Sequence, residues 1–289
     1  IQANMSTKRV LIVYAHQEPR SFNGALKDEA VRTLRENGYE VEVSDLYAMQ
    51  FDPTASRHHF TGKLENPDQF DFQRELRHAN KEGTLPKDVA MELEKLVNAD
   101  LLILQFPMYW MNLPAILKGW LDRCFTEQVC FDTANGTWFD HGPFTAKKAM
   151  LSFTTGGTAS CFSKRGLFGD MTVLLWPIHN TLRFCGFQVL PPHILHAPND
   201  VSMEERQKML SDWSTRLNSI FAEKPLNFVH IENFDVEDGF QLSHSYMEQA
   251  EQLKFGPTAG QNIGKPFESV VKDKKLNQLS RTTSDDEES

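Results

Sequence analysis

The chain has 289 residues, 40% of them hydrophobic, and a formal net charge of −9. This length allows one large domain or two modest ones with an extensive core. The acidic balance argues against a nucleic-acid-binding protein, which needs a basic face. Four scattered cysteines without a C-x-x-C pair predict reduced thiols rather than a disulfide or zinc framework. The sequence has no apolar leader and no run of about 20 apolar residues, so we expect a cytosolic protein.

Short apolar runs alternate with helical patterns along the first two thirds of the chain. Buried strands are predicted at residues 9–15 (RVLIVYA), 39–45 (YEVEVSD), 100–106 (DLLILQF), 149–153 (AMLSF) and 186–190 (GFQVL). Helices are predicted at residues 25–37, 87–98 and 115–124, and Gly38 is expected to end the first. The stretch between residues 52 and 86 is less regular. This alternation predicts an α/β fold with a doubly wound parallel sheet.

Ligands of such sheets bind beyond the carboxyl ends of the strands, where polar or glycine-rich loops converge. The loop after the first strand lacks G-x-G-x-x-G, which disfavours a dinucleotide-binding Rossmann loop. It offers His16, Ser21, Phe22 and Asn23 where a helix begins, an arrangement typical of a phosphate site. The alternative is that Ser21 merely caps the helix.

Two further loops at this edge have a composition that suits a flat ligand. Thr154-Thr155-Gly156-Gly157 follows a buried strand, and its backbone N–H groups can face a developing negative charge. A simple left-handed turn explains the glycines equally well. The segment PMYWM at residues 107–111 could form an aromatic wall for a flavin ring, although such runs are more often core.

Several segments resemble, in the same order, the NAD(P)H:quinone oxidoreductases known as DT-diaphorases and their sister enzymes that prefer ribosyl-dihydronicotinamide. They are KRVLIVYAHQEPRSFNGALK, SDLYAM, ADLLILQFPMYWMNLPAILKGWLDR, LSFTTGG and RFCGFQVL. The resemblance runs from about Lys8 to about Lys265. It implies a flavodoxin-like homodimer that binds FAD and reduces quinones by two electrons. The implied reaction is ping-pong hydride transfer from NAD(P)H through flavin N5, with active sites completed by the second subunit.

The resemblance also implies roles for individual residues. The FAD phosphates and adenosine would be held by His16, Ser21, Phe22 and Asn23, and the adenine end by Arg206. The isoalloxazine and ribityl regions would contact Pro107, Met108, Tyr109, Trp110 and Met111, and the pyrimidine edge would face Thr154, Thr155, Gly156 and Gly157. The quinone pocket would be lined by Phe131 and Phe184, one from each subunit, with Phe228 or Phe234 at its mouth.

The chain departs from the family at its proton-handling positions. The family has a Tyr and a His after the glycine pair, whereas the segment SCFSKRGLFGD places Phe162 and Phe168 there. A phenyl ring donates neither a hydrogen bond nor a proton, so this contribution is absent or supplied otherwise. Backbone N–H groups at Gly156 and Gly157 would remain as the catalytic electrostatic contribution, and water would protonate the quinone.

Two other departures concern metal binding and substrate range. The sister enzymes hold a structural metal with two His and a Cys, but Arg183 stands four residues after His179 here, and we predict no metal. His193 and His196 are expected to be surface or capping residues. The loop at 126–140 is slightly longer than in the family, and Thr133 replaces an aromatic, which affects the predicted substrate range.

The predicted organisation is a tail at 1–7, a flavodoxin-like catalytic domain at 8–224, an extension at 225–272 and a disordered acidic tail at 273–289. The extension resembles that of the diaphorases, which implies NADH or NADPH as the reductant. The alternatives are a flavin-binding regulatory or scaffold protein with weak turnover, and a related azo- or nitroreductase. A one-electron flavodoxin carrier is least favoured because the chain is too long.

Overall fold

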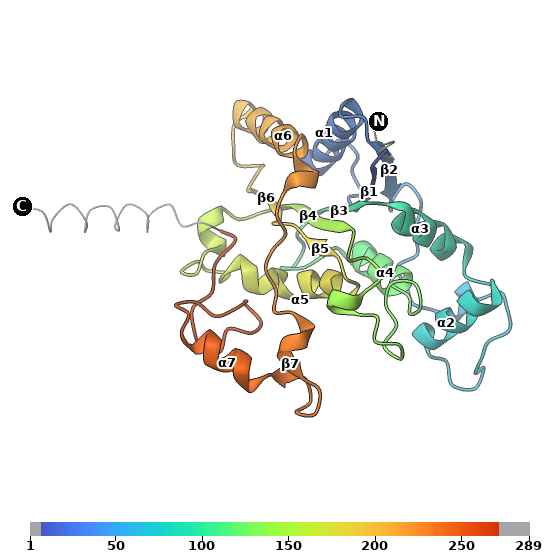
Figure 1. Cartoon of the computed structure of the whole chain (residues 1–289). Coiled ribbons are helices and arrows are strands. Elements are labelled where there is room, and N and C mark those ends of the chain that lie inside the picture. Colours follow the sequence, from blue (N-terminus) through green and yellow to red (C-terminus); the bar gives the residue numbers. More distant parts are fainter. Residues whose placement is uncertain (1–6, 272–289) are drawn as a thin grey trace, which may run out of the picture. The chain divides into compact units, whose positions relative to one another are not determined.

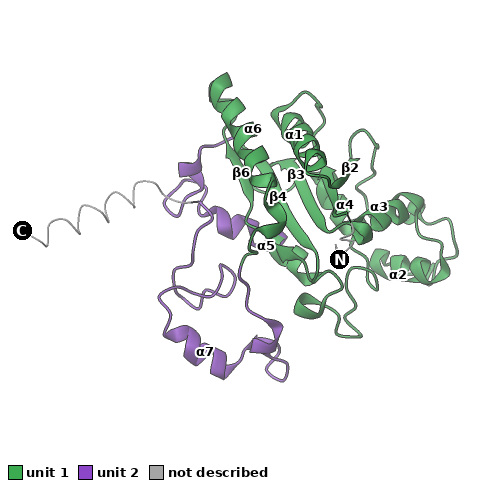
Figure 2. Cartoon of the chain, turned by 45° about the horizontal axis from the view of Figure 1, so that its top comes forward, with its two compact units in different colours: residues 1–155, 179–226 green, residues 156–178, 227–289 purple. Residues whose placement is uncertain are grey.

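The computed structural model describes residues 7–271 (Figure 1). The chain divides into two compact units, which are coloured separately in Figure 2. Unit 1 comprises residues 1–155 and 179–226, and unit 2 comprises residues 156–178 and 227–289. Segment 156–178 therefore groups with the C-terminal extension. The predicted acidic tail and most of the N-terminal tail lie outside the described residues.

Unit 1 is built on a six-stranded sheet with the order β2-β1-β3-β4-β5, and β6 also pairs with β4. All of these pairings are parallel, which confirms the predicted doubly wound α/β sheet. The strands are β1 (Arg9–Tyr14), β2 (Glu40–Asp45), β3 (Leu101–Pro107), β4 (Lys148–Thr155), β5 (Gln188–Val189) and β6 (His193–His196). Every residue of β3 is buried, as expected for a central strand covered on both faces.

Helices α1 (Phe22–Glu36) and α6 (Met203–Leu217) lie side by side against the sheet (Figures 1 and 2). Their core joins Leu26 of α1 and Trp213 of α6 to Ile12 of β1. The remaining helices of unit 1 are α2 (Phe72–Glu82), α3 (Lys87–Asn98) and α4 (Ala115–Cys124), with short 3₁₀ turns at Arg57–His59, Phe139–His141 and Ile220–Ala222. Helix α5 (Met171–Phe184) begins in unit 2 and ends in unit 1.

Helices α3 and α4 have the bounds that their patterns predict, but the structure adds α5, β6, α2 and α6, which the patterns did not indicate. Asp71 caps α2 through the Arg74 N–H, and Gly83 ends it in the left-handed region with φ of 67°. Helix α6 starts with a capping box between Ser202 and Glu205. Both helices carry local start signals, but charged residues dominate them, so their mean hydropathy is low.

Unit 2 consists of short elements and the first part of α5. Its first part contains a 3₁₀ turn at Ala159–Phe162. Its C-terminal part contains a second 3₁₀ turn at Ile231–Asn233, a two-stranded hairpin of β7 (Phe234–Asp235) and β8 (Gln241–Leu242), and helix α7 (His244–Glu251). The two parts are connected by side-chain hydrogen bonds: the Ser269 hydroxyl donates to Asp170 Oδ1 at 2.8 Å, and the Val270 N–H donates to Thr172 Oγ1 at 2.9 Å.

All four cysteines have free thiols, as predicted. Within residues 7–271, no helix is long and apolar enough to cross a membrane.

The start of α1 tests how tightly the first loop is packed. A Cβ added to Gly24 would lie 2.0 Å from the Pro19 carbonyl oxygen, whereas a Cβ on Gly156 would meet no described atom within 4 Å. We therefore expect Gly24→Ala to lower the free energy of unfolding by about 1–3 kcal/mol through overpacking. Gly156→Ala is the matched control and should change it by less than about 0.5 kcal/mol. Urea denaturation of the flavin-free variants measures both; equal stabilities would contradict the packing described.

Candidate functional site

The carboxyl ends of three neighbouring strands bring the predicted loops of unit 1 together. In the parallel register, Tyr14 of β1 lies opposite Gln105 of β3, and Pro107 of β3 lies opposite Thr154 of β4. The loops that follow these strands consequently leave the sheet at the same edge. This arrangement matches the predicted convergence of residues 16–23, 107–111 and 154–155.

A buried amide network fixes the three loops to one another. Asn23, at the start of α1, donates from Nδ2 to Thr154 Oγ1 at 2.8 Å. Its Oδ1 accepts a hydrogen bond from Gln105 Nε2 at 2.9 Å. The three side chains are 4%, 7% and 1% exposed, respectively. Asn23 and Thr154 were predicted to bind cofactor; their side chains connect α1, β4 and β3, which leaves their backbone groups to face a ligand.

The first loop presents donors suited to an anion. His16 Nδ1 accepts the Glu18 N–H at 3.0 Å, so the neutral ring carries its proton on Nε2, which is a donor. Burial lowers the pKa of His16 and favours this neutral form. Ser21 caps α1 by accepting the Gly24 N–H at 3.1 Å, as the simpler interpretation proposed. The Phe22 side chain is half-buried and packs against the core.

The loop after β3 forms a strained turn with an exposed tryptophan. Tyr109 and Asn112 exchange two backbone hydrogen bonds of 3.0 Å, and between them Trp110 and Met111 have φ values of 49° and 60°. Two successive positive φ values define a type I′ turn, which normally takes Asn and Gly. Trp110 is 96% exposed. The aromatic segment is therefore not core at this position, and unrelieved strain beside an exposed ring is typical of a ligand contact.

The other predicted cofactor residues of unit 1 are fixed by burial or by hydrogen bonds. Thr155 is buried, and its Oγ1 lies 2.9 Å from His196 Nδ1. Pro107 is buried as the last residue of β3, and Met108 donates its N–H to the Thr154 carbonyl oxygen at 2.8 Å. Arg206, on α6, donates from Nη2 to the Asn199 carbonyl at 3.3 Å, and its buried Nε has no hydrogen-bond partner among the described residues.

Aromatic side chains of unit 1 surround a cavity of about 250 Å³. It is lined by Phe125, Phe131, Asn180, Thr181, Phe184 and Cys185. The rings of Phe131 and Phe184 meet edge to face with centroids 5.0 Å apart. Within one chain these two rings are therefore neighbours, and their placement in a quinone pocket shared between two subunits stays a prediction. Thr133 lies outside this lining; it is exposed and its hydroxyl donates to Glu127 Oε1 at 3.2 Å.

In unit 2, two phenyl rings cover Gly157. Phe162 is 4% exposed and Phe168 is 37% exposed, and their centroids lie 5.1 Å apart. A Cβ added to Gly157 would lie 3.3 Å from the Cε2 atoms of both rings. The positions that the family uses for proton handling therefore adjoin the glycine pair, but they carry no donor. Elsewhere in this unit, the Phe228 ring lies 6.0 Å from Trp176, and Phe234 starts the β7–β8 hairpin.

The histidines differ from the sequence prediction. His193 is not a surface or capping residue: its ring stacks on Trp213 at 4.3 Å, and burial lowers its pKa to about 3. His196 hydrogen-bonds Thr155 and is half-buried. His179 is buried, which lowers its pKa to about 4, and Arg183 packs its guanidinium 4.6 Å from the Phe139 ring.

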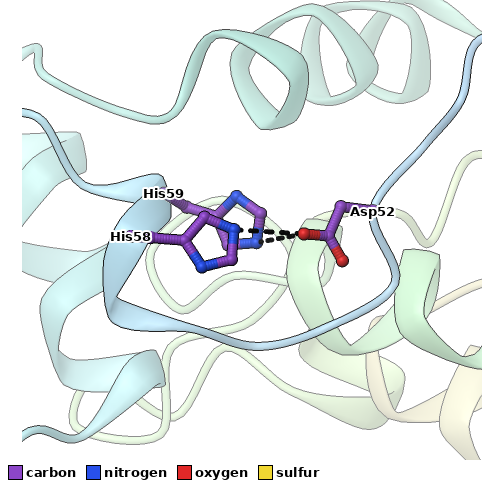
Figure 3. Close-up of side chains that lie close together, drawn as sticks. All are labelled: Asp52, His58 and His59. Carbon is purple, nitrogen blue, oxygen red and sulfur yellow. Dashed lines mark hydrogen bonds and ion pairs between the residues drawn. The ribbon is translucent and has the colours of Figure 1, made fainter.

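A cluster that the sequence analysis missed consists of Asp52, His58 and His59 (Figure 3). It lies in the stretch between β2 and α2 that showed no regular pattern. The adjacent histidines were the available signal, but the carboxylate six residues earlier has no fixed spacing that a pattern could detect.

Comparisons with known proteins place the chain. Residues 8–217 match the family model described as flavodoxin-like fold. A guinea pig (Cavia porcellus) NAD(P)H dehydrogenase [quinone] 1 is 44% identical over 263 residues, 90% of this chain and 95% of that protein. The chain belongs to the NAD(P)H:quinone oxidoreductase family.

Two further relatives show how far the likeness extends. The ribosyldihydronicotinamide dehydrogenase [quinone] of Pongo abelii is 50% identical over 223 residues, 77% of this chain and 96% of that protein. The crystal structure of a putative quinone reductase from Klebsiella pneumoniae superposes with a TM-score of 0.76 at 33% identity, covering 83% of this chain and 95% of that one. The resemblance found in the sequence is thereby confirmed at the level of family and fold.

The strained turn generates a prediction. Replacing Trp110→Asn together with Met111→Gly should relieve positive-φ strain and raise the free energy of unfolding of the flavin-free protein by about 1–3 kcal/mol. The same change should weaken flavin binding, because the exposed ring is lost. Gln128→Gly is the matched control, since Gln128 is exposed with φ of 71° and should gain stability without losing flavin. Urea denaturation and flavin titration test this; a double variant that binds flavin as tightly as the parent would contradict it.

Proposed function

We propose that this protein catalyses the two-electron reduction of quinones by NAD(P)H with FAD as its cofactor, and that it works as a cytosolic homodimer. The observation that carries the proposal is the strained, exposed Trp110–Met111 turn beside the start of α1, at the edge where ligands of doubly wound sheets bind. Membership of the quinone oxidoreductase family supports the same chemistry.

The residues of this edge fit a flavin. When bound, FAD would supply hydride acceptance from the reductant and hydride donation to the quinone. The His16 Nε2–H and the backbone N–H groups at the start of α1 suit its phosphates, because helix N-termini favour anions. Trp110 and Met111 suit one face of its ring system.

FAD is favoured over a mononucleotide by Arg206. Its buried Nε lacks a hydrogen-bond partner among the residues described, and such a donor normally costs about 1–3 kcal/mol when left unsatisfied. An adenine or ribose acceptor would satisfy it. The resemblance to the family assigns this position to the same end of the cofactor.

The length of the aligned region favours NADH or NADPH as the reductant. The NAD(P)H-named relative aligns over 90% of this chain, whereas the ribosyldihydronicotinamide relative aligns over 77%. The difference corresponds in size to the C-terminal extension, where Phe228 and Phe234 would line the mouth of the substrate site. NADH should therefore give a higher kcat/KM than ribosyl-dihydronicotinamide.

A second chain is needed to complete the substrate pocket. The aromatic cavity around Phe131 and Phe184 has a volume of about 250 Å³, below the roughly 300–1,000 Å³ of sites that enclose small ligands. We propose that a second copy closes this cavity into a quinone site, with the rings of one chain forming one wall. The slightly longer loop at 126–140, including Thr133, would set the range of acceptors.

The chain's own catalytic contribution is electrostatic. Backbone N–H groups at Gly156 and Gly157 would stabilise negative charge on the reduced cofactor, because oriented backbone donors stabilise charge that develops during a reaction. Phe162 and Phe168 pack beside Gly157 and donate no proton. The quinone would then take its protons from water.

Restoring the donors tests this account. We expect Phe162→Tyr with Phe168→His to accelerate reduction of the bound flavin by NADH, up to the roughly 10²–10⁴-fold that positioned acid–base groups supply. Phe162→Leu with Phe168→Leu is the control that keeps the sites apolar. Stopped-flow absorbance under anaerobic conditions measures the rate; equal rates in the parent and the Tyr–His variant would contradict the proposal.

The lack of both donors also supports a second candidate, a flavin-binding regulatory or scaffold protein that turns over weakly. Anaerobic visible spectra separate the two. Bleaching of the flavin band by NADH and its recovery with a benzoquinone would establish both half-reactions, and a band that stays oxidised would favour the regulator. Recovery with an azo dye or a nitroarene, but not with the quinone, would indicate the related azo- or nitroreductase instead.

A further inference from the structure

The Asp52–His58–His59 cluster lies within unit 1, in the loop that enters the 3₁₀ turn Arg57–His59 (Figure 3). Asp52 Oδ2 lies 3.1 Å from His58 Nε2 and 3.4 Å from His59 Nε2. All three potential ligand atoms lie within 4.8 Å of one another. The rings come from consecutive residues, yet both point at one carboxylate oxygen.

We propose that Asp52, His58 and His59 form a binding site for a divalent zinc-type ion. Zinc binds imidazole nitrogen and carboxylate oxygen at about 2.0–2.2 Å in tetrahedral geometry, which places neighbouring ligand atoms about 3.3 Å apart. The observed nitrogen–oxygen separations of 3.1 and 3.4 Å match that edge length. The third separation, between the two imidazole nitrogens, is at most 4.8 Å, and an ion would hold it near the same edge length.

Neighbouring groups hold the ligands in orientation. Asp52 Oδ1 accepts hydrogen bonds from the Thr54 N–H at 2.9 Å and the Thr54 hydroxyl at 2.6 Å, which leaves Oδ2 directed at the rings. Ser56 Oγ lies 2.8 Å from His58 Nδ1. Because a hydroxyl can accept as well as donate, it can hold the tautomer in which Nε2 is free for a metal.

Two contacts of the metal-free protein compete with an ion. His58 Nε2 bonds Asp52 Oδ2 at 3.1 Å, and since a carboxylate only accepts, this nitrogen must give up its proton before it can ligate. The second contact is between His59 Nε2 and the Thr54 carbonyl oxygen, at 2.9 Å. A carbonyl only accepts, so the His59 Nε2 carries a proton in the metal-free protein. When an ion binds, this proton must pass to the other ring nitrogen or to solvent. Arg123 brings a positive charge close to the cluster, since its Nη1 donates to the Asp52 carbonyl oxygen at 2.7 Å. The Arg123 charge is itself offset by Asp88, at 2.6 and 3.1 Å.

The exposure of the cluster leaves a coordination position open. The His58 side chain is 64% exposed and Asp52 is 39% exposed, whereas His59 is 9% exposed. Water or a further ligand would complete the four positions. Two imidazoles and one carboxylate favour zinc and similar transition metals over Mg²⁺ and Ca²⁺, which prefer all-oxygen sites.

The test is calorimetric titration of chelator-treated, flavin-loaded protein with ZnCl₂. A Cys161→Ser background removes the partly exposed thiol, which could also bind zinc. We expect one zinc ion per chain, with affinity about tenfold or more weaker in His58→Ala and in Asp52→Asn. His58 is largely exposed and Asn keeps the shape of Asp, so both variants should fold; circular dichroism and flavin content verify this.

His244→Ala is the matched control, because His244 and Glu248 form another exposed histidine–carboxylate pair at 3.3 Å but have no third ligand among the described residues. It should bind zinc as the parent does. Excess MgCl₂ should not compete. The proposal would be overturned by a parent protein that fails to bind zinc, or by His58→Ala and Asp52→Asn variants that bind it with unchanged affinity.

Discussion

The buried amide of Asn23 holds the candidate site together. It bonds Thr154 on one side and Gln105 on the other, so the start of α1, the end of β4 and the end of β3 cannot move independently. Buried polar groups are costly unless they are paired, and this pairing makes one relative position of the three elements much better than any other. The loops that follow these elements are therefore also fixed relative to one another.

This constraint allows the loops themselves to be strained and exposed. The Trp110–Met111 turn has two positive φ values in residues that rarely adopt them, and it leaves an indole almost fully in solvent. Such a turn persists only where the surrounding structure holds it, and here β3 and the bonded pair Tyr109–Asn112 do so. The free-energy cost is offset by the core formed by α1, α6 and the sheet. Under the proposed function, this turn would already be formed before a flat ligand binds.

Much of this arrangement could be predicted from the sequence. Continuous apolar runs indicated β1, β3 and β4, and the loops after them leave the sheet at one edge as expected, because parallel strands share one carboxyl edge. Helices α2 and α6 were not predicted because charged residues dominate them and few apolar residues mark their buried faces. Helix α5 was not predicted either, although its sequence is apolar, and it contains Pro177. Short β6 was missed because the polar ends of HILH obscured a strand that pairs with β4 along its full length.

Side-chain roles were harder to predict than element positions. Sequence alone could not show that Asn23 and Thr154 bond each other across 131 positions, because that pairing exists only in the folded sheet. The same holds for Phe131 and Phe184, which meet within one chain, and for the ring of His193, which stacks on a tryptophan of a helix that was not predicted. The Asp52–His58–His59 cluster depends on a loop conformation, which spacing does not encode.

The central claim is that the edge fixed by Asn23 binds FAD. Titration of flavin-free protein with FAD and with FMN, followed by flavin fluorescence, tests it most directly when Asn23→Leu is measured beside the parent. The account predicts one FAD per chain, tighter binding of FAD than of FMN, and a marked loss of affinity in Asn23→Leu. A parent protein that binds neither flavin, or an Asn23→Leu variant that remains folded and binds FAD as tightly as the parent, would contradict it.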